Sequence, residues 1–335
     1  MEPVVQYAKT SDGVNIAYFA IGEGASLVYL PAGGSAGQVW RVPELRSWLE
    51  ALSSGRRLIR IDRRGLGLSD RGWRFSAGLT ALDVEAVAKK EGLRRFAIFG
   101  QLETSATAIV YAHRHPQNVS HLVLWCPYPD MASHLASSPA LQAAVAAGEK
   151  DWPTLSELVG LHAAGWEDAE QARRFAAYLR QGADPRSYID VEDFDVRREL
   201  AELTMPVLVL HRRDLQFPSV ELARQVAAGC PGARFVLLDG NAMLPFYGDS
   251  SSVLAAIDDF LAARLSPAPD NLTQRELEIL ALLAAGASNE RIARELSISS
   301  RTVERHIGNI YLKIGAHNRA EATAFAFRHS LVPSP

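Results

Sequence analysis

The chain has 335 residues, of which 48% are hydrophobic and 22% are charged, a composition ordinary for a globular protein with one large and one small domain. It contains no run of about eighteen apolar residues and no basic segment followed by an apolar core, so we expect a cytoplasmic protein without a membrane span or signal peptide. The net charge of −3 does not by itself indicate a nucleic-acid partner, and two cysteines do not make a disulfide framework.

The first 265 residues alternate short apolar, β-rich runs with helical patterns. A hairpin is expected around the turn at Asp12-Gly13. The later runs are continuous rather than alternating, which is typical of strands covered on both faces and therefore of a mostly parallel, doubly wound α/β sheet. The strand signal is lost over residues 127–204, which predicts a helical cap. The six runs are residues 26–30, 57–61, 96–99, 121–125, 206–210 and 234–238.

Several of these segments resemble α/β-hydrolases. SLVYLPAGGSAG is similar to the third strand and the loop after it, RLIRIDRRGLGLSD to the fourth strand with its D-x-R-G-x-G-x-S signature, and MPVLVLHRRD to the strand that leads to the catalytic acid. LLDGNAMLPFYGD is similar to the loop that carries the catalytic histidine. The resemblance implies an α/β-hydrolase-like sensor domain over residues 1–265, with the cap at about 127–204.

The positions that this family uses for catalysis carry other residues. A nucleophile elbow needs Gly-x-Ser-x-Gly, whereas the matching window, residues 100–104, has Leu102 at the serine position. Met243 stands where the histidine is expected, and the acid position falls at Leu215, or at Asp214 if the loop is shorter. A thioether transfers no proton near neutral pH. We therefore expect no enzyme, no metal and no cofactor.

A crevice stripped of its reactive groups could still bind a small apolar molecule. The backbone N–H groups of Gly33 and Glu103 would form the oxyanion hole, although the side chain of Glu103 could repel an anion. Three alternatives stay open: a collapsed core without a ligand, a weak esterase with an unconventional nucleophile, and a dimerisation scaffold. The candidate pocket residues are Gly33, Gly34, Leu102, Glu103, Asp214, Leu215 and Met243.

A linker is expected at residues 266–271, where two prolines interrupt any helix or strand. From Asn271 onwards the chain carries eight Lys or Arg and six Glu, so this end has a net charge of +2 while the remainder has −5. Helices are predicted from a capping box at Thr273 and Glu276, from Ser288, from Ser299 and from Asn318. The third has apolar residues at helical spacing: Val303, Ile307, Ile310 and Ile314.

The stretch from LTQRELEIL to NRAEA closely resembles the LuxR-type (GerE) helix-turn-helix, which implies an all-α DNA-binding domain over residues 272–335. The resemblance also implies that the helix starting at Ser299 reads a major groove, and that the last helix pairs with its twin in a homodimer on a pseudo-palindromic promoter site, next to RNA polymerase. A protein-binding module is the alternative. The predicted contacts with double-stranded DNA are Ser300, Arg301, Thr302, Glu304, Arg305, Asn309, Lys313 and Arg319; Glu304 could instead be a solvated charge paired with an arginine.

Overall fold

The computed structural model describes residues 2–138, 142, 143, 146, 151–182, 191–262, 272–296, 298–314, 316 and 318–328. The chain divides into two compact units, Met1–Leu261 and Ala262–Pro335. The linker predicted at residues 266–271 lies outside the described residues.

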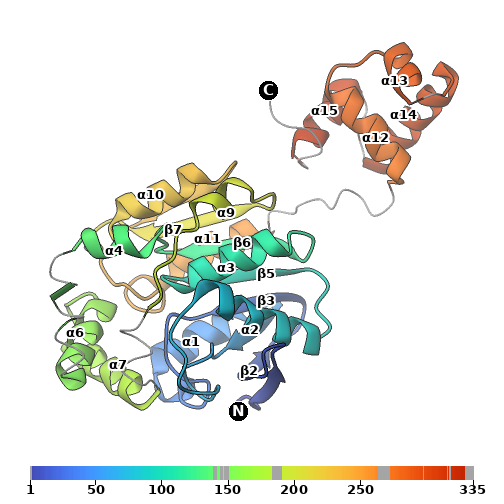
Figure 1. Ribbon diagram of the computed structural model, residues 1–335. Helices are drawn as coiled ribbons and strands as arrows, with labels where there is room; N and C mark the ends of the chain where they lie inside the picture. Colours follow the sequence, from blue (N-terminus) through green and yellow to red (C-terminus); the bar gives the residue numbers. More distant parts are fainter. Residues whose placement is uncertain are drawn as a thin grey trace. The chain divides into compact units, whose positions relative to one another are not determined.

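The large unit is built on an eight-stranded sheet in the order β1-β2-β4-β3-β5-β6-β7-β8 (Figure 1). β2 pairs antiparallel with both β1 and β4, and all the remaining pairs of neighbouring strands are parallel. β5 and β7 are buried at every residue, as the continuous apolar runs predict for strands covered on both faces. The strands are β1 Gln6–Lys9, β2 Asn15–Ile21, β3 Ala25–Leu30, β4 Arg56–Ile61, β5 Phe96–Gln101, β6 Val119–Trp125, β7 Val207–Arg212 and β8 Arg234–Leu238.

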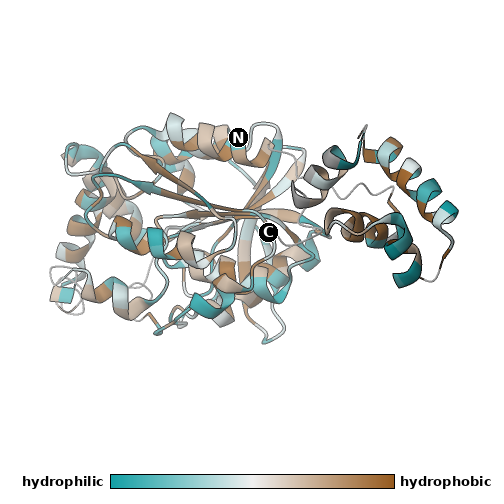
Figure 2. Ribbon diagram, turned by 90° about the horizontal axis from the view of Figure 1, so that it is seen from above, coloured by the Kyte–Doolittle hydropathy of each residue, from teal (hydrophilic) through white to brown (hydrophobic). Residues whose placement is uncertain are grey.

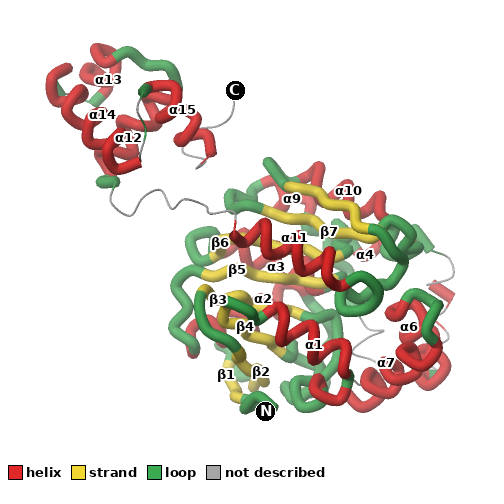
Figure 3. The backbone as a smooth tube through the Cα atoms, turned by 180° about the vertical axis from the view of Figure 1, so that it is seen from behind, coloured by secondary structure: helices red, strands yellow, loops and turns green. Residues whose placement is uncertain are grey.

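Helices cover both faces of this sheet. α1 (Pro43–Leu52) and α11 (Ser250–Ala262) lie on the face turned to the viewer in Figure 3. The opposite face carries α2 (Ala77–Lys90), α3 (Thr104–Arg114) and α10 (Val220–Gly229). Brown, apolar strands run between helices whose outer sides are teal (Figure 2), so the two cores lie directly against the sheet. A short 3-10 helix, Val39–Arg41, precedes α1.

The helical cap consists mainly of two helices that pack on each other, α6 (Trp152–Ala164) and α7 (Ala169–Gly182). α6 begins at the side-chain cap of Asp151 and ends at Gly165, which has a φ of 87°. Two shorter helices also fall within the range predicted for the cap, α4 (Met131–Ala136) and α9 (Arg197–Ala201). α9 packs against α3 and α10, so it covers the sheet rather than the crevice.

The small unit contains four described helices: α12 (Gln274–Ala284), α13 (Asn289–Glu295), α14 (Ser300–Ile314) and α15 (Arg319–Arg328). The capping box predicted at Thr273 and Glu276 is formed. In the predicted apolar stripe of α14, Val303 and Ile310 are buried and the two other isoleucines are partly buried against the same core. In neither unit is any described helix long and apolar enough to cross a membrane.

Candidate functional site

The turn between β5 and α3 has the shape of a nucleophile elbow with leucine at its apex. Leu102 adopts a left-handed conformation with a φ of 50°, which is rare for a non-glycine residue, and its N–H donates to the Trp125 carbonyl over 2.9 Å. A Cβ on Gly100 would lie 2.9 Å from the Cα of Ser105, so the strand and helix need glycine there to approach. The Leu102 side chain is 9% exposed and belongs to the core.

The residues predicted to stand at the acid and histidine positions differ in their exposure. At the end of β7, Asp214 is exposed to solvent whereas Leu215 is buried in the core. Met243 is half-buried, and its backbone makes two hydrogen bonds, one to a side chain of β6 and one to α6. Its carbonyl accepts from Trp125 Nε1 over 2.7 Å, and its N–H donates to the carbonyl of His162 in α6 over 3.3 Å.

The cap closes over the glycine loop that follows β3. Tyr178 of α7 lies so close to Gly34 that a Cβ on that glycine would be 1.9 Å from the tyrosine hydroxyl. The Ser35 N–H donates to Tyr178 Oη over 3.0 Å. An ion pair at 2.6 Å between Arg174 and Glu44 joins the same helix to α1. The face of α7 that carries Tyr178 therefore fills the mouth of the crevice.

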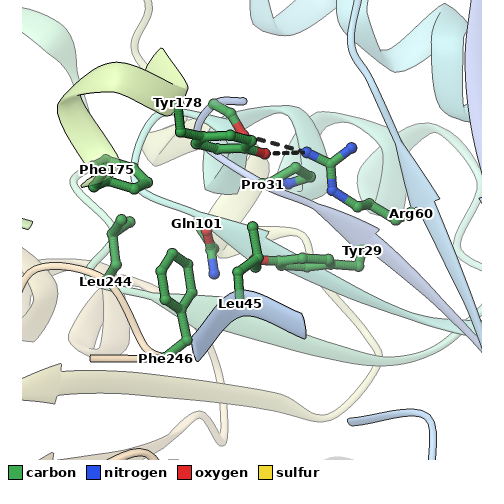
Figure 4. A pocket seen from close by; sticks show the side chains of 10 residues that line it. Tyr29, Pro31, Leu45, Arg60, Gln101, Phe175, Tyr178, Leu244 and Phe246 are labelled. Carbon is green, nitrogen blue, oxygen red and sulfur yellow. Dashed lines mark hydrogen bonds between the residues drawn. The ribbon is translucent and has the colours of Figure 1, made fainter. Parts of the chain in front are cut away.

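Beneath Tyr178 a small cavity remains at the carboxyl ends of β3, β4 and β5 (Figure 4). Its volume of about 20 Å³ suits a single water molecule. Of the seven predicted pocket residues, only Gly33 lines it. The predicted apolar lining is thus incomplete, because buried polar side chains from three strands and from α7 reach the cavity. The lining residues are Tyr29, Pro31, Gly33, Leu45, Arg60, Gln101, Phe175, Tyr178, Leu244 and Phe246.

Glu103, which follows the apex of the elbow, faces a cation rather than the cavity. Its carboxylate lies 3.8 Å from Arg63, whose guanidinium is also 5.0 Å above the ring of Phe75. Burial raises the pKa of Glu103 to about 7, and Arg63 opposes this rise. The elbow therefore holds an acid that titrates near neutrality. Within the described part of the chain, no group of His, Cys, Asp or Glu side chains is arranged to hold a metal ion.

The candidate nucleic-acid surface is the outer face of α14. Arg301, Glu304, Arg305 and Asn309 are exposed at helical spacing, so they form one continuous stripe. Among the described residues, no ion pair includes the two arginines or Glu304. The alternative of a Glu304-arginine pair is therefore not formed here. The sequence did not single out Leu312, which is 84% exposed and continues the stripe.

Two further predicted DNA contacts, Lys313 and Arg319, have bonds within the domain. Lys313 Nζ lies 2.7 and 2.9 Å from the two carboxylate oxygens of Glu276. Arg319 donates to the backbone carbonyls of Leu283 and Ala287, over 3.0 and 2.6 Å. Ser300 is exposed, and Thr302 is half-buried where the Ser299 hydroxyl caps the helix. Lys313 and Arg319 therefore join helices of their own domain, a role that the sequence did not reveal.

The comparisons with known proteins match the two units separately. Residues 270–326 match the family model of bacterial regulatory proteins of the luxR family. The chain is 44% identical over 61 residues to the response regulator protein VraR of Staphylococcus aureus and, equally, to that of Staphylococcus epidermidis. That match covers 18% of this chain and spans only 29% of the length of these relatives.

Residues 25–156 match the model of the alpha/beta hydrolase fold. Similar solved structures include the esterase EaEST from Exiguobacterium antarcticum, with a TM-score of 0.67 at 19% identity, covering 78% of this chain and all of the other. A bromoperoxidase from Bacillus anthracis has a TM-score of 0.66 at 17% identity, covering 77% of this chain and all of the other. At such identities the likeness establishes the fold alone. The chain thus combines an α/β-hydrolase fold with a LuxR-type helix-turn-helix domain, which confirms both resemblances and the predicted fold class.

Proposed function

We propose that this chain, which carries a LuxR-type DNA-binding domain, is a ligand-responsive transcription regulator that acts in the cytoplasm. The stripe on α14 would read base edges of a pseudo-palindromic promoter site in the major groove. Arginine pairs with guanine and asparagine with adenine in bidentate fashion, and glutamate accepts from cytosine, so the stripe carries suitable chemistry for direct readout. We further propose a homodimer and contact with RNA polymerase, as the family resemblance implies.

The large unit, in this proposal, is a sensor without catalytic activity. Acyl transfer needs a nucleophile next to a general base, and the elbow and histidine positions hold Leu102 and Met243. The one ionisable residue at the acid position, Asp214, is exposed to solvent. Leu102 and Met243 at these positions support a domain that binds a ligand without cleaving it.

The observation that carries the sensing proposal is the closed crevice. Phe175 and Tyr178 of α7 line a cavity of about 20 Å³, so a molecule larger than water needs these side chains to move before it can enter. A ligand shifts an equilibrium only by its unequal affinity for two states. A hundredfold preference for the open cap would supply about 2.7 kcal/mol of bias toward that state.

The test is a comparison of DNA affinity between cap variants. Sites are first selected from random duplexes with the full chain, and affinity is then measured by fluorescence anisotropy at fixed salt. The double substitution Phe175→Ala/Tyr178→Ala removes the side chains that close the crevice and is expected to change operator affinity at least threefold. Leu158→Ala in α6, where Leu158 is 41% exposed, is the matched control and should change nothing. Equal affinity of all three proteins would contradict sensing through the cap.

An esterase that also regulates is the second candidate, because several solved structures of the same fold are esterases. Incubation of the full chain with p-nitrophenyl acetate decides between the two. The sensor proposal expects no turnover above that of Leu102→Ala. Turnover by the full chain that exceeds the turnover of Leu102→Ala would favour an enzyme with an unconventional nucleophile. A scaffold without any ligand is the third candidate, and it predicts no thermal shift with any small molecule.

A further inference from the structure

Arg60, which lines the cavity beneath Tyr178, belongs to a buried ion pair with Asp62. Arg60 and Asp62 are bonded to each other, and their side chains are 1% and 0% exposed. The Asp62 carboxylate also accepts from the backbone N–H groups of Ala36, over 2.9 Å, and Leu68, over 3.0 Å. The Asp62 carboxylate therefore lies directly against the Arg60 guanidinium, and the two opposite charges offset each other. The floor of the crevice is therefore polar but has no net charge.

Donor groups around the same cavity lack well-placed acceptors. Arg60 Nε, the side-chain nitrogen of Gln101 and the hydroxyl of Tyr29 are buried and make no hydrogen bond of good geometry. Gln101 and Trp48 lie close enough to the Tyr29 hydroxyl to oppose the rise in its pKa that burial causes. Figure 4 shows the Gln101 amide between Tyr29 and the side chains of the cap. A buried donor without a well-placed acceptor destabilises the fold, so these groups around one cavity favour the binding of an acceptor there.

The position of that acceptor is in part taken by the cap itself. Tyr178 Oη accepts from the Ser35 N–H at 3.0 Å and from Arg60 Nη2 at 3.4 Å. Arg60 Nη2 also reaches the Gly33 carbonyl at 3.4 Å. An incoming oxygen that displaced the phenol could bond to the donors that Tyr178 now uses and to the unpaired ones. Binding would then be coupled to movement of α7.

We propose that the crevice binds a small molecule through a neutral carbonyl oxygen, that of an ester, an amide or a ketone, with its apolar part against Phe175, Leu244 and Phe246. The buried donors of Arg60 and Gln101 would be satisfied by an acceptor oxygen of the ligand. Asp62 already balances Arg60, so a carboxylate ligand would bring an unpaired buried charge and its desolvation penalty. This inference rests on the proposed sensing function and specifies the ligand that it needs.

The test compares 2-octanone with octanoate, which have similar length but differ in charge, by calorimetric titration of the full chain. We expect 2-octanone to bind at least tenfold more tightly. Gln101→Leu, which removes a donor but keeps the volume, should weaken 2-octanone about tenfold, as the loss of one hydrogen bond implies. Tyr247→Phe is the control, because the Tyr247 hydroxyl is also buried and unpaired but does not line this cavity.

Tighter binding of octanoate, no binding of 2-octanone, or an unaffected Gln101→Leu would each overturn the carbonyl inference. Failure of the sensing function gives a different pattern. A ketone that binds as expected but leaves operator affinity unchanged removes sensing and keeps the carbonyl site. Cap variants that alter operator affinity while 2-octanone does not bind keep sensing and remove the carbonyl site.

Discussion

Lys313→Met should destabilise the small unit without altering its electrostatic contact with DNA. The Lys313 ammonium bonds both oxygens of Glu276, whose side chain is 4% exposed, while the lysine side chain is 31% exposed. After the substitution the carboxylate would retain only its bonds from Thr273. Removal of one partner from a buried pair costs about 3–5 kcal/mol, and the exposure of the lysine reduces this to about 2 kcal/mol. That is a large part of the stability of so small a unit.

A loss of about 2 kcal/mol corresponds to a roughly 30-fold increase in the open population, which hydrogen exchange of α12 and α14 in the full chain can measure. Arg291→Met is the control. Arg291 and Glu295 form an exposed ion pair at 2.8 Å, and such pairs contribute at most about 0.5 kcal/mol. The dependence of DNA affinity on salt should be the same for both variants and the wild type. If Lys313→Met left hydrogen exchange unchanged and reduced the slope of DNA affinity against salt by about one, the reasoning would be refuted. Lys313 would then contact a DNA phosphate.

The same pair predicts a pH dependence. Burial alone would raise the pKa of Glu276, but the bonds from Lys313 and Thr273 outweigh it and hold the pKa below its usual value. A carboxyl with a depressed folded-state pKa stabilises the fold above its unfolded-state pKa, and this stability is lost as the pH falls through the folded-state value. Lys313→Met should therefore flatten the acid limb of the exchange profile.

Three further predictions concern the two candidate sites. Arg305→Ala should weaken the selected DNA site by about 1–3 kcal/mol, whereas a random duplex should lose much less; equal losses in anisotropy titrations would exclude base reading. In the wild type, the Glu103 carboxyl ionises from a pH of about 4.5 when the chain is unfolded, but the buried carboxyl keeps its proton until a pH of about 7. The melting temperature should therefore fall as the pH rises between these values, and Glu103→Gln should remove this fall. If both proteins lose stability alike between these pH values, the assignment to Glu103 is wrong. Leu102→Ser should restore no hydrolysis of p-nitrophenyl acetate, because Met243 offers no base; measurable turnover would reveal a base elsewhere.

The sheet could be predicted because burial on both faces leaves a local signal. The apolar run at residues 234–238 became β8 with the same bounds, and the position of Leu102 at the apex followed from its place between a strand and a helix. Arg60 lies inside another apolar run, residues 57–61, and its significance was not recognised from the sequence. A charged residue within a continuous buried strand indicates a buried partner, and that signal could have pointed to the polar floor of the crevice.

The closure of the crevice could not be predicted, because it depends on contacts between distant parts of the chain. Tyr178 and Ser35 are 143 residues apart, and Lys313 and Glu276 are 37 apart. The pattern of α7 shows that one face is apolar but does not identify what it covers. For the same reason the sequence predicts Lys313 and Arg319 as DNA contacts but does not reveal their bonds within their own domain.

The left-handed turn at Leu102 can persist because packing sustains it. A left-handed conformation costs a non-glycine residue about 1–3 kcal/mol, and burial of a leucine side chain returns about 1.5–3 kcal/mol. The closed cap is stabilised on a similar scale. The Tyr178 hydrogen bond contributes about 1 kcal/mol, the part-exposed Arg174–Glu44 pair up to about 1, and burial of Phe175 about 2. A ligand with micromolar affinity for the open cap has about 8 kcal/mol of binding free energy, so about 4 kcal/mol would remain after it displaced these contacts; the closed crevice is thus compatible with a sensor.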